Sequence, residues 1–322
     1  DPENDKSRWG TQQGLVYVNG QKVNIQRPRV VKKSAGRHTE VELETYRAFS
    51  NPDAMNEAVM AKVVAGVSTR DYEKTLEHVL DGHGVSRSAV SRRAVKESGK
   101  LLEEFYTRQF TDREFAVIMI DGIGIADVDN IVALGIDIWG KKQVLGVRQG
   151  ATENTQVCLE LLEDIVERGL KADDDYLFVI DGSKALAKAV KKVFGANSAI
   201  QRCQVHKRRN VSDKLPKEHQ ERIDKRLAAA YSMNELSEAR HALEKVFDEL
   251  ASLNESAAGS LLEGMEETLT VHKIGLTGDL KRTLSSTNSI ESMFSMSRRY
   301  KRNVKKWNRK TNHIERTLVM TL

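Results

Sequence analysis

Three acidic residues occupy positions from which their carboxylates could converge on metal ions. Asp121 ends the apolar run 115–120, Asp181 ends the apolar run 176–180, and Glu291 lies near the start of a segment with helical periodicity. Magnesium and manganese prefer hard oxygen ligands, and carboxylates from separate elements can hold two such ions about 3.5–4 Å apart. Two ions at that spacing support in-line displacement at phosphorus. The first hypothesis is therefore phosphodiester chemistry with Mg²⁺ or Mn²⁺ as the cofactor, in two copies.

Short apolar runs of this kind are typical of strands buried on both faces of a covered sheet. The pattern predicts strands at 115–120, 131–138, 142–148, 176–180 and 199–201, with helices at 154–168 and 184–194. Three strands in a meander, followed by alternating helix and strand, are the order of a ribonuclease H-like α/β fold. In that fold the first and fourth strands carry carboxylates. We expect a catalytic core over 111–205 and 280–322, interrupted by a helical insertion domain over 206–279.

Each acid also has an ordinary structural interpretation. Asp121 precedes a glycine and could form a turn, Asp181 could cap the helix that follows it, and Glu291 could pair with Asn288 in a capping box. Other acids compete for the metal role. We expect Asp137 at the surface, before a hairpin turn, and Asp127 and Asp129 to shape a loop, while Glu153 is the most plausible supporting group.

The composition is that of a folded protein. Of 322 residues, 39% are hydrophobic, enough for a core in each of roughly two or three domains. No uncharged apolar run reaches the roughly 18 residues of a membrane span, and the first residues carry no signal-peptide pattern. Two cysteines exclude a disulfide scaffold and favour the cytoplasm. Because the chain begins with Asp1 rather than Met, we expect it to be part of a longer protein.

The net charge of +5 is concentrated in a few segments. The densest, RRYKRNVKKWNRK over 298–310, holds eight cations and no acid. Its predicted DNA contacts are Arg298, Arg299, Lys301, Arg302, Lys305, Lys306, Trp307, Arg309 and Lys310. Cations of this density neutralise phosphates, and the interleaved aromatic rings could stack on bases. The alternative is a solvated helix face, which usually carries balancing acids.

The first 51 residues predict a small β-containing module. Alternating apolar residues flank Asn19-Gly20 between Val16 and Ile25, which is the strongest short-range signal for a type I′ hairpin. We expect the polar and basic stretch 26–37 to form a loop.

Residues 52–110 predict a helical region. Helix-start signals at 68–71 and at Ser86 suggest two helices joined by a glycine-containing turn, as in a helix-turn-helix. The second helix would then present Arg87, Ser88, Ser91 and Arg92 to the major groove. A helical hairpin packed inside a domain is nearly as good an interpretation.

Cys203 and His206 form a Cys-x-x-His element with Arg202 and Lys207 beside it. A structural zinc site needs four ligands, and no second pair stands at a suitable spacing, so zinc is not favoured. Two interpretations stay open. His206 could lie near the scissile phosphate, with Arg202 and Lys207 contacting phosphates, or Cys203 could be packed as a small apolar group with His206 bonded to backbone.

The block QRCQVHKRRN at 201–210, together with VIDGSKAL at 179–186 and STNSIE at 286–291, resembles the Mutator-like family of bacterial insertion-sequence transposases. Stretches at 120–122, 145–154 and 168–170 support the resemblance, which covers residues 65–321. The Asp, Asp, Cys-x-x-His and Glu elements stand in the family's order. The resemblance implies that Asp121, Asp181 and Glu291 are a metal-binding DDE triad and that Cys203 and His206 are the family's Cys-x-x-His element.

The resemblance also implies an activity and partners. A transposase of this kind hydrolyses phosphodiester bonds at element ends and transfers the freed 3′-hydroxyl into target DNA. Expected partners are terminal inverted repeats, target DNA and further copies of the chain in a homodimer or larger oligomer. The rival hypothesis is a non-catalytic DNA-binding protein derived from a transposase. We prefer the enzyme, because chance would have to supply all three acids within both the fold order and the family block.

Overall fold

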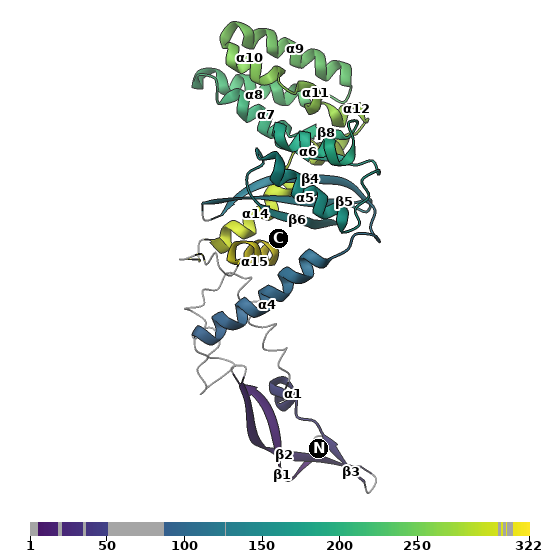
Figure 1. The fold of residues 1–322 in the computed structure, drawn as a ribbon, viewed down its shortest axis with the longest axis vertical. Helices are drawn as coiled ribbons and strands as arrows, with labels where there is room; N and C mark the ends of the chain where they lie inside the picture. Colours follow the sequence, from purple (N-terminus) through teal and green to yellow (C-terminus); the bar gives the residue numbers. More distant parts are fainter. Residues whose placement is uncertain are drawn as a thin grey trace. The chain divides into compact units, whose positions relative to one another are not determined.

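The computed structural model describes residues 6–18, 21–34, 37–50, 87–125, 127–301, 304, 307 and 312–322. The chain divides into two compact units, the first within residues 1–102 and the second over Glu103–Lys301 and Trp307–Leu322. Figure 1 shows the order of their elements along the chain.

The first unit holds a three-stranded antiparallel sheet of β1 (Lys6–Val18), β2 (Gln21–Ser34) and β3 (Arg37–Val41), followed by α1 (Glu44–Ser50). Val18 pairs with Gln21, so a two-residue connection joins β1 to β2 where the sequence predicts a hairpin. The predicted loop over 26–37 is wrong, because β2 continues to Ser34 and pairs with β3. Glu40 of β3 forms ion pairs with Arg27 and Arg29 of β2, so the basic stretch finds its partner across the sheet.

The helix α4 (Arg87–Thr107) begins where the second helix of the predicted helix-turn-helix begins. It runs for 21 residues, and Arg92 is exposed on it. The first helix and the turn of that motif lie outside the described residues, and so do the side chains of Arg87 and Ser88. The helix-turn-helix therefore stays a prediction.

The second unit is built on a mixed five-stranded sheet with the order β6-β5-β4-β7-β8. Its strands are β4 (Phe115–Ile125), β5 (Val128–Asp137), β6 (Lys142–Gln149), β7 (Leu177–Ile180) and β8 (Ala199–Arg202). β4, β5 and β6 form an antiparallel meander, whereas β7 runs parallel to β4 and β8 runs parallel to β7. All five strands match the segments that the apolar runs predict.

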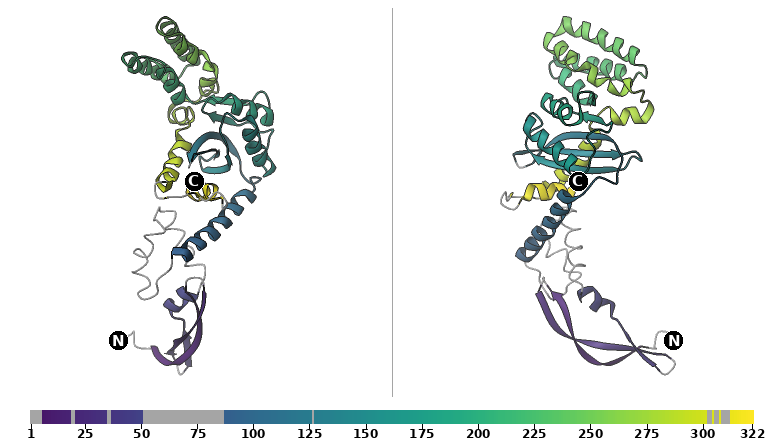
Figure 2. Two further views of the ribbon diagram at one scale, coloured as in Figure 1. Left: turned by 60° about the vertical axis from the view of Figure 1, so that its left-hand side comes forward. Right: turned by 45° about the vertical axis from the view of Figure 1, so that its right-hand side comes forward.

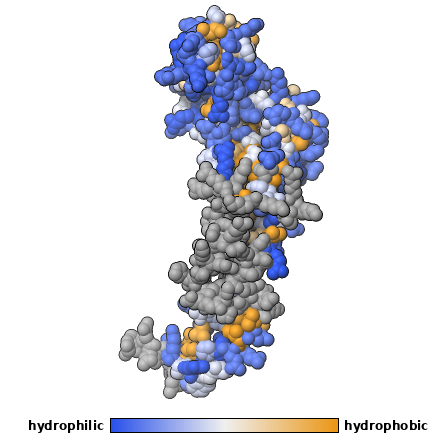
Figure 3. Space-filling model, turned by 90° about the vertical axis from the view of Figure 1, so that its left-hand side faces the viewer, coloured by the Kyte–Doolittle hydropathy of each residue, from blue (hydrophilic) through white to orange (hydrophobic). Residues whose placement is uncertain are grey.

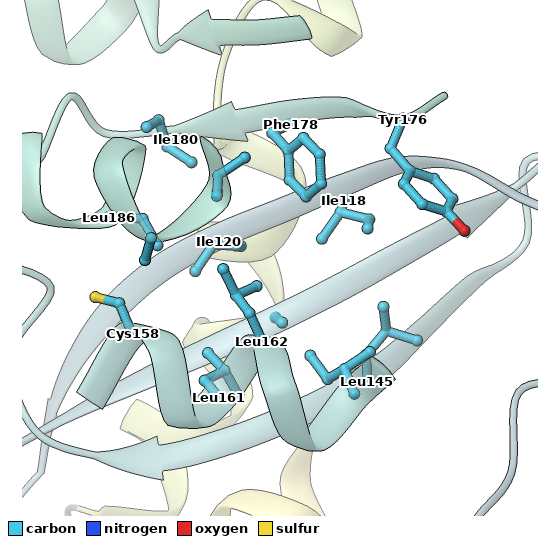
Figure 4. Packing of buried hydrophobic residues seen from close by; sticks show 14 of the residues in the cluster. Ile118, Ile120, Leu145, Cys158, Leu161, Leu162, Tyr176, Phe178, Ile180 and Leu186 are labelled. Atoms are coloured by element: carbon cyan, nitrogen blue, oxygen red, sulfur yellow. The ribbon is translucent and has the colours of Figure 1, made fainter. Parts of the chain in front are cut away.

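Helices cover both faces of this sheet. On one face, α5 (Thr155–Glu167) and α6 (Lys184–Phe194) pack Leu161, Leu162 and Leu186 against Ile118, Ile120 and Phe178 of the strands (Figure 4). On the other face, α14 (Asn288–Lys301) and α15 (His313–Thr321) contribute a second cluster, with Phe294 and Leu318 fully buried. Burial on both faces explains why the strand sequences are continuous apolar runs rather than alternating ones.

Helices fill the sequence between β8 and α14. They are α7 (Gln204–Ser212), α8 (Lys217–Ser232), α9 (Leu236–Leu253), α10 (Glu255–Leu262), α11 (Met265–Thr268), α12 (Thr270–Lys273) and α13 (Gly278–Leu284). Figures 1 and 2 show α8, α9 and α10 grouped on the β8 side of the sheet. They share a cluster of their own that includes Ile223, Leu243 and Leu261. The face of this group seen in Figure 3 is largely hydrophilic. These helices lie in the same compact unit as the sheet, and the separate insertion domain stays a prediction.

Within the described residues, no helix is long and apolar enough to cross a membrane.

Candidate active site

Parallel strands β4 and β7 bring Asp121 and Asp181 to neighbouring positions. Ile120 of β4 lies opposite Ile180 of β7, so the residues that follow them are separated by one strand spacing, about 4.8 Å between backbones. Asp121 is 7% exposed, and its Oδ1 accepts a hydrogen bond from the backbone N–H of Gly122 at 2.8 Å. Because Asp121 and Gly122 both lie inside β4, they do not form the turn that their sequence allows.

Asp181 is held by the connection from β7 to α6. Its Oδ1 accepts a hydrogen bond from the backbone N–H of Ser183 at 2.9 Å. The N-cap of α6 is Ser183, whose Oγ accepts a hydrogen bond from the N–H of Leu186 and donates one to the carbonyl of Thr152 at 2.6 Å. Asp181 is therefore not the helix cap, and its second oxygen, Oδ2, forms no hydrogen bond with a described residue.

Helices α7 and α14 bring His206 and Glu291 together. Nε2 of His206 lies 3.4 Å from Oε1 of Glu291. Thr287 donates a hydrogen bond from Oγ1 to the same carboxylate oxygen at 3.2 Å and lies 3.5 Å from Nδ1 of His206. The backbone N–H of Gln204 donates to the carbonyl of Ser285 at 2.9 Å, which fixes the start of α7 against the segment that leads into α14.

Electrostatic interactions join these four groups into one site. Burial raises the pKa of Asp121 to about 6; the Gly122 hydrogen bond and the positive charge of His206 oppose this rise, while the carboxylates of Asp181 and Glu291 add to it. The hydrogen bond with Cys203 raises the pKa of His206 to about 9 against the effect of burial, and Asp121 and Glu291 contribute in the same direction. An imidazolium thus lies close enough to the carboxylates of Asp121 and Glu291 to be stabilised by both.

Cys203 lies next to this site and forms hydrogen bonds with three different segments. It is fully buried and caps α7, with its Sγ accepting hydrogen bonds from the N–H groups of His206 at 3.5 Å and Thr287 at 3.4 Å. Its own N–H donates to the carbonyl of Ile180 at 2.7 Å. Burial opposes ionisation of the thiol, but the hydrogen bonds from His206 and Thr287 lower its pKa. Cys203 therefore connects the end of β7 with both α7 and the start of α14.

The donor set suits a hard divalent cation, since Asp121, Asp181 and Glu291 all offer carboxylate oxygens. No three Asp, Glu, His or Cys side chains in the described part of the chain are close enough to chelate one ion as they stand. Oε1 of Glu291 contacts His206 and Thr287 instead of a cation. A cation between Asp121 and Asp181 would relieve the repulsion that helps to raise the pKa of Asp121. The chemistry of the three carboxylates is therefore compatible with a divalent cation.

Arg202 and Lys207 do not face a DNA phosphate, and that part of the prediction is wrong. Lys207 is fully buried and donates from Nζ to the carbonyls of Ser260 and Glu263, both at 2.5 Å. Arg202 is 7% exposed, donates to the carbonyl of Glu263 and lies 3.7 Å from its carboxylate. Both cations therefore have partners inside the protein, although Nε of Arg202 has none among the described residues and burial lowers the pKa of Lys207 to about 8. These contacts tie β8 and α7 to the end of α10 and the residue that follows it.

Other predicted residues fall into three groups. Asp137, expected at the surface, is buried and accepts hydrogen bonds from two backbone N–H groups. Trp307, expected to stack on bases, packs against the second core cluster, with its ring centroid 4.9 Å from that of His313. Arg298 is exposed on α14, as expected for a DNA contact. The structure does not describe the remaining predicted DNA contacts, which are residues Arg302, Lys305, Lys306, Arg309 and Lys310 and the side chains of Arg299 and Lys301.

Sequence reasoning missed Thr287, which bridges His206 and Glu291, and Thr152, whose carbonyl anchors Ser183. A signal for Thr287 exists in the polar run SSTN at 285–288, which precedes α14. Thr152 has no comparable signal, because its role depends on the fold bringing the β6–α5 connection next to the β7–α6 connection.

Fold and side chains together define a mixed α/β protein with an acidic site where Asp121, inside β4, lies beside Asp181, which follows the end of the parallel strand β7. The chain belongs to the Mutator family of transposases, whose pattern matches residues 1–322. The resemblance inferred from the sequence is thereby confirmed.

Curated relatives are transposases of bacterial insertion sequences. The transposase for insertion sequence element IS256 in transposon Tn4001 of Staphylococcus aureus is 26% identical over 253 residues, which cover 76% of this chain and 63% of that protein. The transposase for IS6120 of Mycolicibacterium smegmatis is 26% identical over 248 residues, 75% of each chain. The transposase for ISRM5 of Rhizobium meliloti is 28% identical over 258 residues, 78% of this chain and 63% of that protein. The chain thus spans less than two thirds of the length of the first and third of these relatives.

Proposed function

We propose that this chain is the catalytic part of a DNA transposase of the DDE type, built on a ribonuclease H-like core. One observation supports the proposal: the in-register pairing of β4 with β7 sets Asp121 beside Asp181, and the charges of His206 and Glu291 act on the carboxyl group of Asp121. An antiparallel meander followed by strands parallel to its first member is the arrangement expected of that core. The reaction is hydrolysis of phosphodiester bonds at element ends, followed by transfer of the 3′-hydroxyl into target DNA.

The chain's own residues prepare a site for two Mg²⁺ or Mn²⁺ ions. Backbone N–H groups of Gly122 and Ser183 each fix Oδ1 of an aspartate, which leaves Oδ2 of Asp121 and Asp181 as metal ligands. Metal ions held there would supply a nucleophile at neutral pH and stabilise charge on the leaving oxygen. Glu291 would be the third carboxylate ligand. His206, whose pKa is raised to about 9 without metal, would place a positive charge beside the reacting phosphate.

The partners in this proposal are terminal inverted repeats, target DNA and further copies of the chain. Arg298 on α14 is an exposed cation that could contact DNA phosphates, and Arg92 is exposed on α4. The basic segment that continues from Arg298 belongs to the same proposal.

The test is incubation of the protein with element-end DNA and Mg²⁺ or Mn²⁺, comparing the parent chain with Asp181→Asn. Asp175→Asn is the matched control, since Asp175 is an exposed acid in the loop before β7. We expect the parent and the control to nick and join DNA, and Asp181→Asn to bind DNA without cutting it. A parent chain that binds but neither nicks nor joins would favour a non-catalytic DNA-binding protein instead.

A further inference from the structure

Four cations line an open groove at the end of β4 remote from Asp121. The groove has a volume of about 480 Å³ and is lined by Arg108, Gln109, Arg113, Lys141, Lys142 and Gln143. All four cations are exposed, and none of them forms an ion pair with a described carboxylate. Asp112 and Glu114 flank one of them in sequence but do not line the groove. A groove lined only by cations and amides is complementary to a polyanion.

The turn between β5 and β6 presents an apolar surface next to this groove. Trp139 is 78% exposed, more than any other large hydrophobic side chain in the described residues, and Ile138 beside it is 55% exposed. Lys141 and Lys142 of the groove follow in the same turn and strand. An aromatic ring that is left in water loses the stabilisation that burial gives, so its exposure next to a basic groove indicates a binding surface.

Hydrogen bonds make this turn rigid. The buried Asp137 accepts hydrogen bonds at Oδ1 from the N–H groups of Trp139 at 3.0 Å and Lys141 at 2.8 Å. Gly140, at φ +79°, donates to the carbonyl of Asp137 at 2.9 Å. The N–H of Ile138 donates to the carbonyl of Glu114 at 3.1 Å, which ties the turn to the segment that carries Arg113. The backbone of the turn is therefore held in one arrangement next to the segment that carries Arg113, so little backbone order has to be gained on binding.

We propose that this surface binds an unpaired DNA strand, with phosphates in the groove and a base stacked on Trp139. The positive groove follows the backbone, and an exposed ring at the tip of a turn offers the flat platform on which an unstacked base packs. Phe115 pairs with Asp137 at this end of the sheet, and Asp121 lies six residues further along β4. The surface is thus roughly 20 Å from the carboxylate site and separate from it. The choice of DNA as the polyanion rests on the proposed function.

The experiment measures binding of a fluorescein-labelled oligothymidine and of a labelled duplex to the full chain by fluorescence anisotropy, with EDTA present. Variants are Trp139→Ala and the double variant Arg113→Gln/Lys142→Gln. The matched control is Lys192→Gln/Lys245→Gln, which removes two exposed lysines from α6 and α9. We expect Trp139→Ala to weaken binding of the unpaired strand roughly tenfold and to leave duplex binding unchanged. The groove variant should flatten the slope of log K against log salt by about 1.4, since each phosphate contact contributes about 0.7 for a single strand.

Two outcomes would overturn the proposal. The first is that the groove variant binds the unpaired strand no more weakly than the lysine control does, whether both lose affinity equally or neither loses any. The other is unchanged DNA binding by Trp139→Ala together with a shift from dimer to monomer in sedimentation, which would make this surface a contact between copies of the chain. EDTA removes metal-dependent cleavage from the measurement. A parent chain that fails to cut DNA therefore refutes the proposed function without affecting this result.

Discussion

Replacing Asp121 with asparagine should stabilise the metal-free protein, because folding buries a carboxylate among other carboxylates. The pKa of Asp121 rises from an ordinary 3.8 to about 6 in the folded chain. Between these values the folded state binds more protons than the unfolded state, so stability falls as pH rises through this window. At about 1.36 kcal/mol for each pKa unit, the native carboxylate costs about 3 kcal/mol above pH 6. Asparagine keeps the acceptor for the N–H of Gly122 and carries no charge.

Urea denaturation in EDTA checks this prediction. At pH 7.5, Asp121→Asn should unfold with a free energy about 3 kcal/mol above that of the parent chain, and the difference should disappear near pH 3.5. Asp129→Asn is the control, because Asp129 is an exposed acid on β5, and its change should stay within about 0.5 kcal/mol. Added Mg²⁺ should stabilise the parent and not Asp121→Asn. A variant less stable than the parent at pH 7.5, or a difference that does not depend on pH, would refute the reasoning.

Three further predictions concern the supports of the site. Phe294→Ala, at a fully buried position on α14, should cost about 3–5 kcal/mol in urea denaturation, and a cost below about 1 kcal/mol would contradict the packing of that helix. Gly182→Ala should lower both the melting temperature and DNA cleavage. Gly182 has φ +109°, and a Cβ there would lie 2.2 Å from Nε of Arg202. An unchanged melting temperature would count against this close approach. The imidazole of His206 should titrate near pH 9 in NMR spectra, so its contribution to stability is complete below pH 6.5 and is lost as pH rises through about 9; a midpoint at or below 6.5 would contradict the stabilisation of the imidazolium by Cys203, Asp121 and Glu291.

The strands and the helices that cover them could be predicted from local sequence. An apolar run such as 115–120 has no solvated face in any arrangement, so it specifies a buried strand wherever it lies. Residues 26–37 show the limit of this reasoning. Their polarity suggested a loop, but β2 runs through most of them, because their backbone pairs with β1 and β3, and Glu40 of β3 also pairs with Arg27 and Arg29.

The order of acids and the Cys-x-x-His element by themselves determined the family and the candidate ligands Asp121, Asp181 and Glu291, because residue identity and order are properties of the chain. Only the tertiary structure decided what surrounds them. Arg202 and Lys207 look like phosphate ligands in a polar local sequence, yet their partners are carbonyls of Ser260 and Glu263, far along the chain. Burial, and with it the raised pKa of Asp121 and the pairing of His206 with Glu291, depends on which distant segments pack together. A linear pattern of residue types does not contain that information.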